Sequence, residues 1–191
     1  HSLDSHSHAS VRRLSQRYTH EGILTMYKIA IFFLLMLVSN ISFCGVTIHY
    51  SGNVSDIKNV EKIYDISKKY AEEKKWKISQ FNNGYTIYPA EWCEPLNIKF
   101  SGKKLSEDFV KTQFAGIDIH IEILGLFTKI KPFMQKLNVI DEGEYWETKN
   151  KETLKVNFEF VTKSMAQIKS QHPSAKGPTK LPDGRIIDLH R

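Results

Sequence analysis

The chain has 191 residues, of which 41% are hydrophobic and 25% charged, with 27 Lys and Arg against 21 Asp and Glu. The resulting charge of +6 is modest, and the lysines alternate with acidic residues, so the sequence lacks the basic stripe that nucleic-acid binding requires. Two cysteines are too few for a small secreted scaffold held together by disulfides.

Residues 1–25 precede the first methionine and show little apolar periodicity. Their histidines, at positions 1, 6, 8 and 20, are irregularly spaced and have no cysteine partners, which disfavours a metal-binding tract. We predict that this segment is an upstream or disordered extension and that Met26 begins the protein.

Residues 26–44 have the layout of a secretory signal peptide. Lys28 supplies a positive charge, residues 29–38 are an unbroken apolar run, and small residues precede Gly45. A membrane-spanning helix needs about 20 apolar residues, roughly twice this run. We therefore expect cleavage before Gly45 and a periplasmic or secreted protein. The alternative is an uncleaved signal-anchor, which would be the protein's only contact with a membrane.

After this segment, the pattern of apolar residues predicts alternating strands and helices. The Asn82-Asn83-Gly84 run is typical of a hairpin turn, residues 51–53 of another turn, and Ser55 of a helix N-cap. The predicted strands are residues 46–50, 76–81, 85–88, 96–100 and 109–114, and the predicted helices are residues 55–75 and 149–170.

Three later segments are less regular. Residues 117–123 alternate strictly, as in a strand, but also fit a helical stripe that continues to residue 137, and we favour a helix from about Asp118 that Pro132 kinks or ends. Residues 139–145 read as a loop or short strand. Residues 172–191 read as an extended arm that ends in an edge strand at residues 186–189.

The order of elements favours an α+β fold. We predict one small domain at residues 45–171, with a mostly antiparallel sheet and two or three helices packed on one face. It is preceded by the signal peptide and followed by the arm.

Asp118, His120 and Glu122 form the first candidate site. On a strand the three side chains would share one face, where carboxylates and an imidazole could bind a metal or transfer protons. On a helix only Asp118 and Glu122 would be neighbours. The polar side of a half-buried element explains the pattern better, so we assign neither a metal nor a cofactor.

Residues 141–147 form the second candidate, with four carboxylates beside two aromatic residues. Capping and packing explain the carboxylates first, because acidic residues favour the start of a following helix. A surface that binds a protein partner ranks second, and acid–base catalysis third. The residues assigned to partner binding are Asp141, Glu142, Glu144, Tyr145 and Trp146.

Cys93 would be the one thiol left after cleavage. Its neighbours Glu91 and Glu94 would raise its pKa, which disfavours a nucleophile and favours a buried structural residue or a pairing with another chain.

The sequence contains no glycine-rich phosphate loop and no hydrolase or zinc-binding motif. Our first expectation is a secreted or periplasmic protein-binding domain without enzymatic activity, either immunity-like or accessory. The alternatives are a small hydrolase that uses the carboxylate and histidine groups, and a structural protein of the cell envelope. Convergence of His120 with Asp141 or Glu142 in one concave pocket would favour the hydrolase, and a flat surface without a pocket would favour binding.

Overall fold

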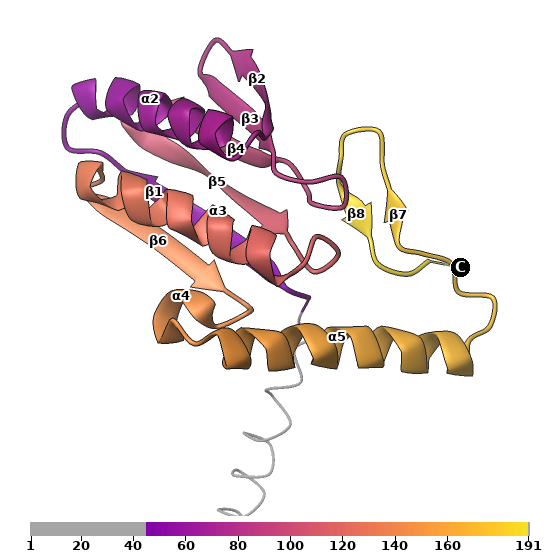
Figure 1. Cartoon of the computed structure of the whole chain (residues 1–191). Coiled ribbons are helices and arrows are strands. Elements are labelled where there is room, and N and C mark those ends of the chain that lie inside the picture. The colour runs from indigo at the N-terminus through magenta and orange to yellow at the C-terminus, as the bar shows by residue number, and fades with distance from the viewer. Residues whose placement is uncertain (1–44, 191) are drawn as a thin grey trace, which may run out of the picture. The chain divides into compact units, whose positions relative to one another are not determined.

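The computed structural model describes residues 45–190, in which six strands form an antiparallel sheet in the order β2-β3-β4-β5-β1-β6 (Figure 1). The predicted signal peptide and the segment before it lie outside these residues. The strands of this sheet are β1 (Thr47–Asn53), β2 (Lys77–Phe81), β3 (Gly84–Tyr88), β4 (Leu96–Ser101), β5 (Lys104–Lys111) and β6 (Lys136–Asp141).

Helices pack against this sheet, which confirms the predicted α+β fold. The helices are α2 (Lys58–Glu73), α3 (Ile117–Ile130), the 3-10 turn η1 (Lys131–Phe133), α4 (Tyr145–Thr148) and α5 (Lys151–Gln171). The arm adds a small hairpin of β7 (Thr179–Lys180) and β8 (Ile186–Ile187). Among residues 45–190, the structure contains no helix with the length and apolar character to cross a membrane.

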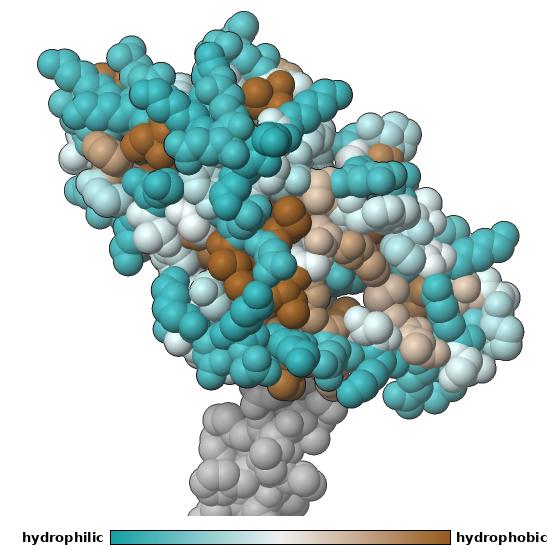
Figure 2. Space-filling view, in the orientation of Figure 1, coloured by the Kyte–Doolittle hydropathy of each residue, from teal (hydrophilic) through white to brown (hydrophobic). Residues whose placement is uncertain are grey.

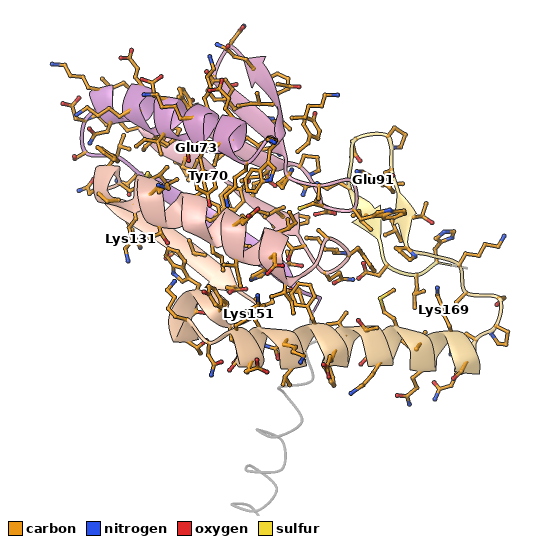
Figure 3. The ribbon with its side chains drawn as sticks, in the orientation of Figure 1. Tyr70, Glu73, Glu91, Lys131, Lys151 and Lys169 are labelled. Atoms are coloured by element: carbon orange, nitrogen blue, oxygen red, sulfur yellow. The ribbon has the colours of Figure 1, made fainter. Side chains whose placement is uncertain are left out.

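Helices α2 and α3 lie side by side on one face of the sheet (Figure 1). The buried residues of α2 recur every three or four positions, as an amphipathic helix requires. Between the two helices, the Tyr70 hydroxyl donates a hydrogen bond of 2.9 Å to the carbonyl of Glu122 (Figure 3). Apolar side chains of β1, β3 and β4 complete the core beneath them, among them Ile48, Ile87, Leu96 and Ile98.

The segment with two possible interpretations, residues 117–123, is helical. A turn at residues 112–116 reverses the chain, and Gly116 adopts a positive φ of 94° directly before α3. The apolar stripe then continues through Leu124, Phe127 and Ile130, all buried, so a helix buries more surface here than a half-exposed strand would. Pro132 lies in η1, where the helix ends, as predicted.

Several predicted boundaries were wrong. Strand β1 continues through the predicted turn at residues 51–53, because β5 and β6 pair with it on both sides. Strand β5 begins at Lys104 and ends before residues 112–114. Ser55 does not cap α2; the carboxylate of Asp56 accepts from the Lys58 amide instead, at 3.0 Å.

Strands β4 and β5 pair only beside their connecting turn. Farther along β4, the backbone of Asn97 has no partner on β5 and forms its hydrogen bonds with the Tyr50 hydroxyl instead. This hydroxyl donates to the carbonyl of Asn97 at 2.8 Å and accepts from the amide of the same residue at 3.0 Å. A side chain from β1 thus completes the hydrogen bonding of β4 where the sheet opens.

The arm attaches at this opening through Arg185. Its guanidinium contacts Asp108 at 2.7 Å and Glu94 at 3.2 Å, and lies 4.2 Å from the ring centroid of Phe109. Glu94, only 2% exposed, also accepts from the amide of Ile186 at 2.8 Å. At the other end of the arm, Lys169 of α5 donates to the carbonyl of Gly177 at 2.6 Å (Figure 3).

Helix α5 is held by a narrow apolar stripe, as its spacing predicts. Leu154 is its one buried residue, and Phe158, Val161, Met165 and Ile168 are half-buried or nearly so. A cavity of about 270 Å³ remains between Val161, Met165 and Phe114, and Figure 2 shows apolar side chains along the seam between α3 and α5.

Candidate functional site

A buried chain of polar contacts links Thr112, His120 and Asp141. His120 projects from α3 toward the ends of β5 and β6. Its Nδ1 lies 2.7 Å from the Thr112 hydroxyl and its Nε2 lies 3.0 Å from Asp141 Oδ1. Nε2 is thus within ion-pair distance of the carboxylate, but it forms no hydrogen bond of acceptable geometry with residues 45–190. Phe158 of α5 packs edge-on against the imidazole at 5.9 Å between centroids.

Asp141 organises the turn that follows β6. Its two carboxylate oxygens accept from the amides of Gly143 at 2.7 Å and Trp146 at 2.8 Å. Burial alone would raise the pKa of this carboxyl. The hydrogen bonds and charge of His120, together with the two amides, outweigh burial, so the pKa of Asp141 lies below its ordinary value. The side chain is therefore a buried carboxylate whose acceptor positions are filled by the protein itself.

The order Thr–His–Asp is also that of a nucleophile, a base and an orienting acid. Solvent does not reach it, however, because the side chains of His120 and Asp141 are 0% exposed and Thr112 is fully buried. The Thr112 hydroxyl also lies 3.0 Å from the Val46 carbonyl. In this arrangement no reacting atom is open to a substrate, and the chain joins α3, β5 and β6 as a structural link.

The other two members of the first candidate site lie apart from His120. Asp118 pairs with Lys151 at 2.9 Å, and Glu122 pairs with Lys74 at 2.7 Å. Each pair joins α3 to a neighbouring helix, α5 or α2, at the protein surface. Because 117–123 is a helix, Asp118 and Glu122 lie on one face and His120 points the opposite way into the core, so the three side chains form no common site.

The second candidate segment divides into a buried part and an exposed part. Asp141 is the buried part and holds the turn through its hydrogen bonds with backbone amides. Glu142 accepts from the Thr47 amide at 3.1 Å and lies 3.4 Å from Nε2 of His49. Glu144 is exposed with a positive φ of 61°, while Tyr145 and Trp146 are half-buried.

Lysines surround the two aromatic rings of this segment. Nζ of Lys149 lies 4.3 Å from the ring centroid of Trp146, and Nζ of Lys131 lies 5.6 Å from the same centroid. Lys149 also lies 5.8 Å from the ring of Tyr145. The corner is thus mixed in charge, rather than the acidic surface that the sequence alone suggests.

The face of the sheet opposite α2 and α3, called the open face below, has a row of one imidazole and two apolar side chains across three strands, called the apolar row below. His49 of β1 pairs directly with Phe109 of β5 and with Ile140 of β6, so the three side chains lie on the same face. Phe109 is 37% and Ile140 62% exposed as whole residues, and His49 is half-buried as a residue with a side chain that is 44% exposed. Glu142 adjoins the row through its contact with His49.

Sequence reasoning missed this row and the Arg185 contacts. The alternation of β1 contains a signal for the row, because His49 occupies the outward position between the buried residues Ile48 and Tyr50. The pairing of β1 with β5 and β6 depends on strand order, which one sequence does not reveal. The same limit applies to Arg185, which lies far in the chain from Glu94 and Asp108.

Cys93 is a buried free thiol, as the sequence favours. Burial first, and then the charge of Glu94, raises its pKa to about 12, so the thiol stays protonated at neutral pH.

Among residues 45–190, no three His, Cys, Asp or Glu side chains are grouped closely enough to bind a metal ion. No family model matches the chain, and it has no significant match among curated proteins or solved structures.

Proposed function

We propose that this protein is a protein-binding domain without enzymatic activity that works outside the cytoplasm. Its docking surface is the apolar row Phe109–His49–Ile140 on the open face, with Glu142 and Glu144 at the rim. The partner is a protein that presents apolar side chains to the row and a hydrogen-bond donor or basic group to the rim.

The observation that carries this proposal is the exposure of Ile140 on an ordered strand. At 62% exposed, it leaves a large aliphatic side chain in water beside an exposed aromatic ring. Apolar residues fixed on a rigid strand lose little conformational entropy on binding, and such residues dominate interface energies. Cationic groups already lie over the rings of Trp146 and Phe109, so Ile140 is the main anchor of the docking surface.

The hydrolase alternative draws less support. It needs His120 to meet a substrate, and His120 is sealed between α3, α5 and the end of β6. An enzyme would have to open this part of the core before each turnover, at the expense of the hydrogen bonds that hold the turn at residues 141–146.

The docking surface can be tested by site-specific photocrosslinking in the cells that produce the protein. A benzoylphenylalanine at Ile140 is compared with one at Val156 of α5, which is 63% exposed and so equally accessible. We expect one defined crosslinked protein at Ile140 that is absent at Val156, and loss of its binding in an Ile140→Lys variant. Identical crosslinks at both positions would contradict the proposal.

The location rests on the signal-peptide pattern alone and needs a separate measurement. N-terminal sequencing of the protein from a periplasmic or extracellular fraction is expected to begin at Gly45. A chain that still contains residues 29–38 and sediments with membranes would instead support the signal-anchor.

A further inference from the structure

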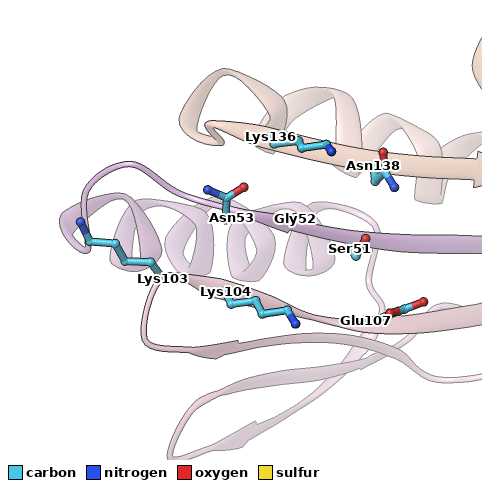
Figure 4. A pocket seen from close by; sticks show the side chains of 8 residues that line it. All are labelled: Ser51, Gly52, Asn53, Lys103, Lys104, Glu107, Lys136 and Asn138. Carbon is cyan, nitrogen blue, oxygen red and sulfur yellow. The ribbon is translucent and has the colours of Figure 1, made fainter.

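A polar hollow of about 430 Å³ lies on the open face, two residues along each strand from the apolar row. Figure 4 shows the three strands that line it, with the helices behind them. The side chains used below are Lys104 and Glu107 of β5, Ser51 and Asn53 of β1, and Lys136 and Asn138 of β6.

The strand register places two lysines in one row across the sheet. Asn53 pairs directly with Lys104 on one side and with Lys136 on the other, so the three side chains share a face. Lys104 and Lys136 therefore start two strand spacings apart, about 10 Å, and flank Asn53. Ammonium groups on flexible stems can converge from this separation on one group bound above Asn53.

These two lysines have no acidic partner among residues 45–190, where every ion pair involves other lysines, histidines or Arg185. The third lysine, Lys103, donates to the Ser55 carbonyl at 2.7 Å at the rim. Glu107 is the single carboxylate of the lining. Two like charges held in one row repel each other, and an anion between them would remove that repulsion.

Two departures from regular pairing create the hollow. Between Tyr50 and Gly52 the register shifts by one residue, so that β5 bulges opposite β1. On the other side, a Cβ at Gly52 would lie 2.4 Å from the Lys136 carbonyl, so glycine allows β6 to approach closely. The bulge turns the side chain of Glu107 toward the hollow. The close approach of β6 brings Lys136 and Asn138 to the same hollow.

We propose that this hollow binds the phosphate ester of a sugar or similar polyol. The phosphate lies between the ammonium groups of Lys104 and Lys136, above Asn53. Hydroxyl groups of the polyol donate to the carboxylate of Glu107 and exchange hydrogen bonds with Ser51 and Asn138. Lysine is a common point-charge ligand for phosphate, and side-chain amides and carboxylates match sugar hydroxyls in both hydrogen-bonding directions.

Glu107 favours a phosphorylated polyol over a bare anion. A carboxylate beside the lysines repels inorganic phosphate, but it accepts hydrogen bonds from hydroxyl groups. The volume is within the range of small-molecule sites, while the polar lining disfavours an apolar ligand. This ligand site is separate from the proposed protein-binding row, so either proposal can fail without the other.

The test is calorimetric titration of the full chain with glucose 6-phosphate, glucose and inorganic phosphate, together with amide NMR shifts. We expect glucose 6-phosphate to bind at least about tenfold more tightly than glucose or inorganic phosphate and to shift the amides of residues 51–53 and 136–138. Vesicles of phosphatidylcholine with and without phosphatidylglycerol test the same chemistry on a lipid headgroup. Binding only to the phosphatidylglycerol vesicles would support the site with a lipid source.

The variants Lys104→Gln and Lys136→Gln are each expected to weaken the binding about fivefold, whereas Lys155→Gln, an exposed lysine of α5, leaves it unchanged. Glu107→Gln is expected to strengthen the binding of inorganic phosphate. The difference between the affinities for glucose 6-phosphate and inorganic phosphate should therefore become smaller. Circular dichroism confirms that each variant is folded. The proposal is overturned if none of the probes binds, or if all three lysine variants weaken binding equally.

Discussion

Nε2 of His120 lies 3.0 Å from Oδ1 of Asp141, and neither side chain has any exposed surface. This contact joins the middle of the sequence to its later part, since α3 and the end of β6 meet there. The carboxylate of Asp141 also accepts hydrogen bonds from the amides of Gly143 and Trp146, which fixes the conformation of the next turn. The pair therefore fixes where α4 and α5 leave the sheet.

Replacing Asp141 with Asn is expected to lower the free energy of unfolding by about 3 kcal/mol at neutral pH, because an amide NH2 replaces one buried carboxylate oxygen that accepts from Gly143 or Trp146 and leaves that backbone donor unpaired. The pKa of Asp141 is lowered in the folded state, so its stabilisation is present above the unfolded pKa of about 4 and is lost as the pH falls through the lower folded pKa. The difference between wild type and variant should therefore shrink below about pH 4.

Urea unfolding followed by circular dichroism across a series of acidic pH values measures this difference. A difference that stays constant from neutral pH into that acidic range would show that the charge of Asp141 makes no contribution.

A second prediction concerns the hydroxyl of Tyr50. Tyr50→Phe leaves the half-buried amide of Asn97 without its acceptor and the Asn97 carbonyl without its donor. We expect a loss of about 1–3 kcal/mol in the free energy of unfolding and faster hydrogen exchange at the Asn97 amide.

Tyr85→Phe is the matched control, since the hydroxyl of Tyr85 forms no hydrogen bond with the part of the chain that the structure describes. If both variants lose the same stability, the Tyr50 hydroxyl does not act as the hydrogen-bonding partner of Asn97.

Local patterns in the sequence predict the elements of this fold well. The spacing of Val60, Ile63 and Tyr70 identifies α2, and Asn83-Gly84 identifies the turn between β2 and β3. These signals depend only on near neighbours in the chain, where side-chain direction follows from helix or strand geometry. The boundaries of β1 and β5 depend on their mutual pairing, and they were predicted less well.

The candidate site shows the same division. The sequence singles out both His120 and Asp141 as groups that a hydrolase would bring together, but it does not reveal that they meet in the buried core. Their contact depends on how α3 crosses the sheet to reach β6, a relationship between segments that one sequence does not encode locally. Because both side chains are buried, they hold segments of the fold together instead of acting at the surface.

Helix α5 offers a comparison between two apolar residues only two positions apart. Leu154 is fully buried, whereas Val156 is 63% exposed. We expect Leu154→Ala to lower the free energy of unfolding, or of local opening of α5, by about 2–5 kcal/mol, because it removes buried methyl groups and leaves a cavity. Val156→Ala is expected to change it by less than about 0.5 kcal/mol.

Native-state hydrogen exchange of the α5 amides, together with urea unfolding, measures both effects. Equal exchange in the two variants would mean that the helix is not held at its N-terminal end by Leu154.

The arm allows a test of one side chain that makes several contacts. Arg185 contacts two carboxylates and also donates to the Phe109 carbonyl at 2.9 Å. Burial opposes ionisation of Asp108, but hydrogen bonds from Asn97 and Arg185 hold the pKa of that carboxyl below its ordinary value. Arg185→Lys keeps the charge but loses the planar fork that reaches both carboxylates, so we expect weaker attachment of the hairpin.

The readout is hydrogen exchange at the Ile186 amide, which donates to Glu94. We expect about tenfold lower protection in Arg185→Lys, equivalent to about 1.4 kcal/mol of local stability. Lys169→Gln is the control, because Lys169 makes a single exposed contact with the same arm at Gly177. Since exposed contacts contribute little, its effect should be less than about twofold. Equal effects from the two variants would place the anchor of the arm at Gly177 rather than at Arg185.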